Sequence, residues 1–134
     1  MNKRFFNINS KKIAYVDQGK GNPFVFIHGN PTSSFLWRNI IKELKNDFRC
    51  IAPDLIGMGD SEKLDVPSEK NYSLVQHINW FNSFMDKLNL DKKVTLVIHD
   101  WGSAIGFDYA KRNAEKISGI VFMEAIVFTS NLAE

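Results

Sequence analysis

The sequence predicts an α/β fold in which helices cover both faces of a mostly parallel sheet. Strand-like and helix-like segments alternate along the 134 residues, as they do when helices connect successive strands. Two of the strand-like segments, residues 24–28 and 94–98, are almost entirely apolar, which is typical of strands buried on both faces. In such sheets ligands bind at the carboxyl ends of the strands, so we expect a site in the loops that follow them.

Four strands and one helix are expected in the first half of the chain. Residues 4–8 predict a first strand, and residues 11–18 alternate apolar and polar side chains, as a half-buried strand does. The apolar strand over 24–28 follows a glycine-rich turn. Apolar residues at helical spacing then predict a helix from about 34 to 45, and residues 48–52 (FRCIA) predict the next buried strand.

The second half is expected to add two helices and two strands. Ser73 and Gln76 match a capping box, and the apolar residues after them recur at helical spacing to about residue 90. A strand over 94–98, a helix over about 102–113 and a strand over 119–123 complete the series. Four loops, with the sequences HGNP, PDLIGMGD, HDWGS and MEAI, are therefore expected on one rim of the sheet.

Composition and charge argue against several classes of protein. The 134 residues are one domain or less, and 44% are apolar, as in an ordinary globular protein. A net charge of +2 without a basic run argues against a nucleic-acid partner. The single cysteine, Cys50, fits a reducing compartment, and neither a signal peptide nor a membrane span is recognisable. We therefore expect a cytoplasmic protein without nucleic-acid or membrane partners.

The joint between the strand over 94–98 and the following helix carries an aspartate. In a nucleophile elbow a reactive side chain lies at a sharp strand-to-helix turn, usually within G-x-S-x-G. The matching stretch here is IHDWG, with Asp100 in the serine position and Ile98 in place of the first glycine. Aspartate also caps helix N-termini well, so this local pattern leaves both the nucleophile and the cap open.

A second motif on the same rim favours the nucleophile. The strand over 24–28 ends in His-Gly-Asn-Pro, and a loop at this place presents backbone N–H groups to the elbow. In such a fold the oxyanion hole uses the N–H after the nucleophile and one from this loop, here those of Trp101 and Asn30. The two motifs together are much more specific than either alone.

Four longer segments resemble a known family. HGNPTSSFLWRNI, DLIGMGDSEK, LVIHDWGSAIGFDYAKR and GIVFMEAI are similar, in order and spacing, to the haloalkane dehalogenases of the α/β-hydrolase fold, over about residues 3–126. The resemblance implies an α/β-hydrolase-type, mostly parallel sheet with helices on both faces. The asparagine of HGNP and the glutamate of MEAI resemble the subgroup that takes its halide-binding asparagine and its acid from these places.

The resemblance also implies roles for four residues. Asp100 would be the nucleophile that attacks the halogen-bearing carbon and forms an alkyl ester. Asn30 and Trp101 would bind the halide through side-chain N–H groups and the oxyanion through backbone N–H groups. Glu124 would orient the general-base histidine, although a glutamate at a strand end is by itself more simply a solvent-facing residue. The implied reactants are a small haloalkane and water, with no cofactor and no metal.

The chain departs from the family at its C-terminal end. The family's fold continues with a helical cap, two more strands and a base-bearing loop, and no histidine here occupies the position of that base. We expect His28 to support its loop, His99 to point inward and His77 to lie partly exposed at the surface. The resemblance thus predicts that residues 1–134 are the N-terminal portion of a single domain, truncated after the sixth strand. Two origins stay open: a truncated reading frame, or half of a split enzyme with a complementing C-terminal half as its partner.

Other functions stay open. Epoxide hydrolases also combine an elbow aspartate with HGxP, although they usually have glycine where this chain has Ile98 and Ser103. A coelenterazine luciferase-like oxygenase shares much of the pattern. From a different class, a non-catalytic fragment or interaction module would bind a partner through its apolar edge strand. The spacing of Gly57, Gly59 and the nearby acidic residues disfavours a dinucleotide loop and a calcium loop.

Overall fold

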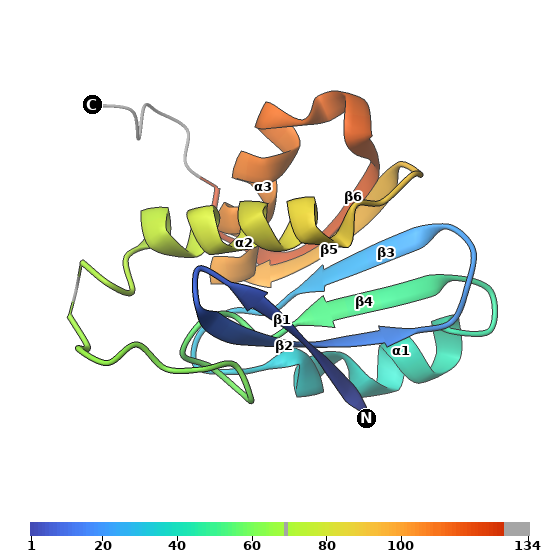
Figure 1. The fold of residues 1–134 in the computed structure, drawn as a ribbon. Helices are drawn as coiled ribbons and strands as arrows, with labels where there is room; N and C mark the ends of the chain where they lie inside the picture. Colours follow the sequence, from blue (N-terminus) through green and yellow to red (C-terminus); the bar gives the residue numbers. More distant parts are fainter. Residues whose placement is uncertain (69, 128–134) are drawn as a thin grey trace.

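The computed structural model describes residues 1–68 and 70–127, whose strands form one mixed sheet (Figure 1). The elements are β1 (Lys3–Ile8), β2 (Lys11–Gln18), β3 (Pro23–Ile27), η1 (Ser34–Trp37), α1 (Arg38–Leu44), β4 (Arg49–Pro53), α2 (Leu74–Leu88), β5 (Val94–Asp100), α3 (Trp101–Arg112), η2 (Ala114–Lys116) and β6 (Ile117–Ala125). The strand order is β1-β2-β4-β3-β5-β6. The last four strands in this order run parallel, whereas β1 and β2 pair antiparallel with their neighbours.

Helices cover both faces of the sheet, as the sequence predicts. α2 and α3 lie over one face and α1 lies over the other (Figure 1). Successive residues of β3 point to opposite faces: Ile27 belongs to the core cluster under α2 and α3, whereas Phe26 packs with Trp37 and Ile41 of η1 and α1. β3 is therefore buried on both faces, which is why its sequence is almost entirely apolar.

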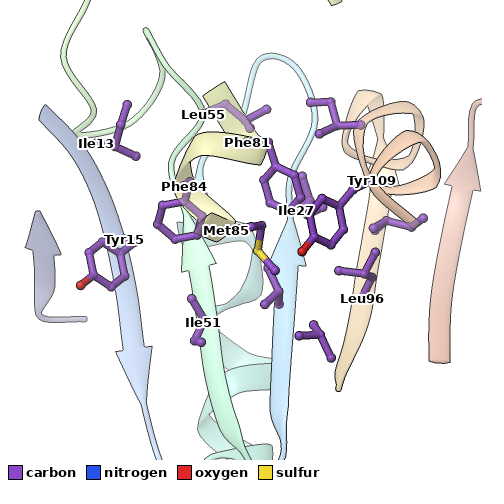
Figure 2. Close-up of a cluster of buried hydrophobic side chains, with 14 of the residues drawn as sticks. Ile13, Tyr15, Ile27, Ile51, Leu55, Phe81, Phe84, Met85, Leu96 and Tyr109 are labelled. Carbon is purple, nitrogen blue, oxygen red and sulfur yellow. The ribbon is translucent and has the colours of Figure 1, made fainter. Parts of the chain in front are cut away.

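The larger core lies between the sheet and helices α2 and α3. Figure 2 shows Phe81, Phe84 and Met85 of α2 and Tyr109 of α3 gathered over the strands. Phe81 and Tyr109 meet edge-on with their ring centroids 5.5 Å apart, a favourable aromatic geometry. This packing anchors α3 on the sheet, so it also fixes the place where α3 begins, at the carboxyl end of β5.

The predicted strands and helices occur in the predicted order, but the helix expected over about 34–45 is divided into the 3₁₀ helix η1 and α1, and the 3₁₀ helix η2 was not predicted. α3 begins at Trp101, one residue earlier than expected and directly after β5. Within the described residues β6 is the outer strand and pairs with β5 alone, and its residues Val121 and Phe122 are 47% and 60% exposed. The expected apolar outer strand is therefore confirmed. None of the helices in the described part of the chain has the length and apolar character needed to cross a membrane.

Candidate active site

Asp100 lies at a strained turn between β5 and α3. Its backbone has φ 52° and ψ −130°, a conformation that costs a non-glycine residue roughly 1–3 kcal/mol. Asp100 occupies the N-cap position of α3, but its side chain makes no capping hydrogen bond, so the carboxylate does not cap the helix. The turn instead leaves the carboxylate available for contacts across the rim of the sheet.

The loop after β3 reaches Asp100 across this rim. The Asn30 N–H donates a hydrogen bond to Asp100 Oδ2 at 3.1 Å. Two glycines allow the close approach, because a Cβ at Gly29 would overlap the Asp100 carboxylate and a Cβ at Gly102 would overlap the Ile27 carbonyl. The two motifs that the sequence analysis singled out are therefore in direct contact.

A hollow of about 1250 Å³ opens beside this contact. Asn30 and Trp101 lie in its wall and are both exposed, Trp101 by 41%. Ile105, one turn further along α3, lines the same hollow. More of the wall comes from the connection between β4 and α2 and from the start of α2, and it is mainly apolar: Leu55, Ile56, Met58, Leu64 and Leu74. An apolar hollow with a few polar groups at one place is the usual form of a small-molecule site.

Glu124 lies on the neighbouring strand at the same end of the sheet. β6 pairs Met123 with His99 and Ala125 with Asp100, so Glu124 is a bulged residue without a partner on β5, and its φ is 46°. Its side chain is 84% exposed, and its Oε2 lies 3.2 Å from His99 Nε2. Bulges re-aim side chains and are common beside active sites. The predicted acid thus reaches the rim, where its observed partner is His99.

The N–H donors on the rim are suited to binding an anion beside the Asp100 carboxylate. Trp101 Nε1–H is a donor only, and the Asn30 side-chain amide offers two N–H donors. Both residues line the hollow, and the Asp100 carboxylate, which is not part of its wall, is held next to them by the Asn30 N–H. Within residues 1–68 and 70–127, no three His, Cys, Asp or Glu side chains are grouped as metal ligands would be.

His28 supports the loop that carries Asn30, as expected. It is fully buried, and the Leu55 N–H donates to its Nε2 at 3.0 Å. The proton of the neutral ring is therefore on Nδ1, which donates to the Gly29 carbonyl at 2.7 Å. Burial lowers the pKa of His28, so the ring stays neutral and keeps both bonds.

The expectation of a surface position for His77 is wrong. His77 is 8% exposed, lines the hollow, and has a buried Nδ1 without a hydrogen-bond partner among the described residues. Burial first, and then the neighbouring His28, lower the pKa of His77. A signal was present in the sequence, because His77 precedes Phe81 by four residues and thus shares its buried helix face.

Sequence reasoning also missed a buried carboxylate that holds the wall of the hollow. Asp54 is fully buried and accepts hydrogen bonds from Lys3 Nζ at 2.5 Å, the Ser34 N–H at 2.8 Å and the Asp60 N–H at 2.8 Å. Burial raises the pKa of Asp54, but these donors outweigh it, so the net pKa is lowered. The segment DLIGMGD contained a signal for this buried carboxylate in its glycine, Gly59. A Cβ at that position would overlap the Asp54 carboxylate, so the close approach requires glycine.

Comparison with known proteins finds a matching family and several related chains. The family model described as alpha/beta hydrolase fold matches residues 22–133. A haloalkane dehalogenase from Sphingobium indicum is 47% identical over 98% of this chain and 45% of its own length. The crystal structure of a haloalkane dehalogenase from Agrobacterium tumefaciens matches with a TM-score of 0.85 at 38% identity, covering 92% of this chain and 41% of that chain.

A third relative has a different name. A cis-3-alkyl-4-alkyloxetan-2-one decarboxylase from Shewanella oneidensis is 40% identical over 94% of this chain and 39% of its own length. The chain spans less than half the length of each of these three proteins.

Proposed function

Because the chain belongs to the alpha/beta hydrolase fold family, we propose that its rim carries the nucleophile and the halide site of a haloalkane dehalogenase. One observation carries the proposal: the Asp100 carboxylate is held at a strained strand-to-helix turn and receives the Asn30 N–H, and both Asn30 and Trp101 line an apolar hollow. This is the arrangement that a nucleophile elbow requires.

The first step is displacement of halide by the carboxylate. The Asn30 N–H holds Oδ2, so the free oxygen, Oδ1, attacks the carbon that bears chlorine, bromine or iodine. A carbon–oxygen bond forms, the carbon–halogen bond breaks, and its electron pair leaves with the halide ion. The product is an alkyl ester of Asp100, a covalent intermediate that can later be hydrolysed at its carbonyl carbon.

The leaving halide needs donors in a place with little water. The indole N–H of Trp101 and the amide NH₂ of Asn30 fit this role, because both residues lie in the wall of an apolar hollow and both side chains carry N–H donors. Each donor gains strength as negative charge develops on the halogen, so together they favour the transition state over the neutral substrate.

The second step is hydrolysis of the ester. Water attacks the carbonyl carbon, a general base takes its proton, and the alcohol leaves with a proton as the Asp100 carboxylate is regenerated. The developing oxyanion is Oδ2, which already faces the Asn30 N–H, and the Trp101 N–H is its second donor. Glu124 would orient the base histidine, which we assign to a complementing C-terminal half, with residues 1–134 as the N-terminal portion of the same domain.

The test is the reaction of the 134-residue chain with excess 1-bromobutane. We expect one bromide per chain, together with a mass increase of one butyl group that peptide mapping locates on Asp100. The substitution Asp100→Asn should abolish both signals. Asp108→Asn is the matched control, because Asp108 lies on α3, pairs with Arg112 at its surface and should leave the reaction unchanged.

The possible results separate the alternatives. Equal bromide release by the chain and by the Asp100→Asn variant would contradict the proposal. Release of several bromides per chain would mean that a base is present in these residues or in a second copy. A parallel incubation with 1,2-epoxybutane identifies an epoxide hydrolase, which would esterify Asp100 with the epoxide in preference to the bromide.

A further inference from the structure

The hydroxyl of Ser103 joins the ends of two neighbouring strands. Ser103 lies in the first turn of α3 and is fully buried. Its Oγ–H donates to the Asp100 carbonyl at 2.5 Å, and its Oγ accepts from the Ile126 N–H at 2.7 Å. Ile126 follows β6 directly and comes two residues after Glu124. A single side chain thus links the backbone of the nucleophile to the segment that carries the predicted acid.

The strand ladder makes this connection only irregularly, because it resumes at Asp100 and Ala125 after a shift. The register of β5 and β6 shifts between His99 and Asp100, so Glu124 has no partner on β5. A bulge leaves the backbone beyond it free to bend, and Glu124 with its φ of 46° is where this occurs. The Ile126 N–H, just beyond the bulge at Glu124, is hydrogen-bonded to Ser103 of α3. This bond fixes the direction in which β6 ends.

The link requires a hydroxyl, because Ser103 Oγ acts as donor and acceptor at the same time. A serine hydroxyl has one proton, and here that proton is given to the Asp100 carbonyl, so a lone pair remains for the Ile126 N–H. Loss of the hydroxyl would leave the Ile126 N–H without this acceptor at a partly buried place, where an unmade hydrogen bond is costly.

We propose that Ser103 is a positioning residue that sets where Glu124 stands relative to Asp100. The proposal rests on the proposed function only in taking these two carboxylates as the groups that cooperate in ester hydrolysis. The link itself is a property of the fold, and it can be measured without substrate through the contact between Glu124 and His99.

The experiment follows the ring N–H and C–H resonances of His99 by NMR in the 134-residue chain. Glu124→Gln defines the shift caused by loss of the carboxylate. Ser103→Ala should move the His99 resonances in the same direction and leave those of His28 in place. Ser83→Ala is the matched control, because its Oγ also donates to a helix carbonyl, that of Asn79, but on α2.

A second measurement, amide hydrogen exchange, starts with the unsubstituted chain. In the unsubstituted chain the Ile126 amide should exchange slowly with solvent, and Ser103→Ala should accelerate it about tenfold, the effect of one ordinary hydrogen bond. Unprotected exchange of Ile126 in the unsubstituted chain overturns the proposal. Unchanged His99 resonances in either the Ser103→Ala or the Glu124→Gln variant also overturn it. A failed bromide test, by contrast, removes the proposed function and leaves these readouts intact.

Discussion

Asp100 and Glu124 share a backbone conformation that few non-glycine residues adopt. Both have positive φ values, 52° and 46°, and both lie where a strand ends at the same rim. Such strain persists only where the surroundings determine the conformation. For Asp100 they do so through the Asn30 N–H on the carboxylate and the Ser103 hydroxyl on the carbonyl. The two proposed functional carboxylates are therefore among the five non-glycine residues with positive φ in the described part of the chain.

Trp101→Phe should slow ester formation while the fold is kept. The change removes the indole N–H and preserves an aromatic ring, so the halide loses one donor. A hydrogen bond to a charged group contributes about 1.5–3 kcal/mol, which corresponds to a rate lower by roughly 10- to 100-fold. The measurement is the single-turnover rate of bromide release. Trp80→Phe on α2 is the control and should react at the original rate, whereas an equal loss in both variants would contradict a halide role for Trp101.

His77 should make stability depend on pH. Its pKa is lowered in the folded chain, so below about pH 6.5 the unfolded chain takes up a proton that the folded chain does not. Stability is therefore greatest above pH 6.5 and falls as the pH drops, with a slope of at most about 1.4 kcal/mol per pH unit for this one proton. His28 adds to the effect in the same direction, because its pKa is also lowered.

His77→Leu should flatten this dependence. Urea unfolding at pH 7.5 and pH 5.5 measures it, and the variant should lose less stability between the two values than the unsubstituted chain. At pH 7.5 its free energy of unfolding should be equal or higher, because Nδ1 has no partner within the described residues. Asn79→Leu, at an exposed position of the same helix, serves as the control with an unchanged pH slope.

At the scale of elements, Asp54 connects β1, η1 and the loop after β4. Asp54→Asn removes the charge that pairs with Lys3 at a fully buried place, so the free energy of unfolding should fall by about 3–5 kcal/mol. Asp65→Asn breaks a pair of the same type with Lys11, but the Asp65 side chain is 86% exposed and solvent screens the pair, so the loss of stability should be far smaller. Urea unfolding distinguishes the two, and equal losses would show that the Asp54 network adds nothing beyond a surface pair.

The elements themselves follow from local sequence. The N-cap bond of the capping box that predicts α2 is present, since Ser73 Oγ accepts the Gln76 N–H at 3.3 Å. The apolar runs predict β3 and β5 because each is buried on both faces. The contact between Asp100 and the Asn30 loop was also predictable, because the carboxyl ends of adjacent parallel strands meet at one rim.

Features that depend on long-range register were not predictable in this way. The bulge at Glu124 arises from how β6 aligns with β5, and no local pattern specifies that alignment. Lys3 and Asp54 are 51 residues apart in sequence and meet only when β1 joins the sheet. The contact of Glu124 with His99 likewise joins residues on different strands. The roles of Asp100, Asn30, Trp101 and Glu124 stay predictions until the bromide and mass measurements are made.

At the scale of the whole molecule, the sheet has a site at one rim and an apolar strand at one edge. Val121 and Phe122 of β6 are 47% and 60% exposed, and within the described residues β6 has β5 as its only partner. An exposed apolar edge strand is a template for pairing with another chain. The same feature that would receive a complementing half therefore also predicts self-association of the 134-residue chain.

Replacing both Val121 and Phe122 with lysine should suppress that self-association. Charged side chains on an edge strand oppose pairing because two copies would bring like charges together. Sedimentation velocity over a range of concentrations should show the unsubstituted chain associating as its concentration rises and the double variant remaining monomeric. Phe35→Lys is the control, since Phe35 is 58% exposed but lies in η1, away from β6. If the control suppresses association equally, the effect comes from added charge in general. If only the β6 variant does so, the outer strand is the contact surface.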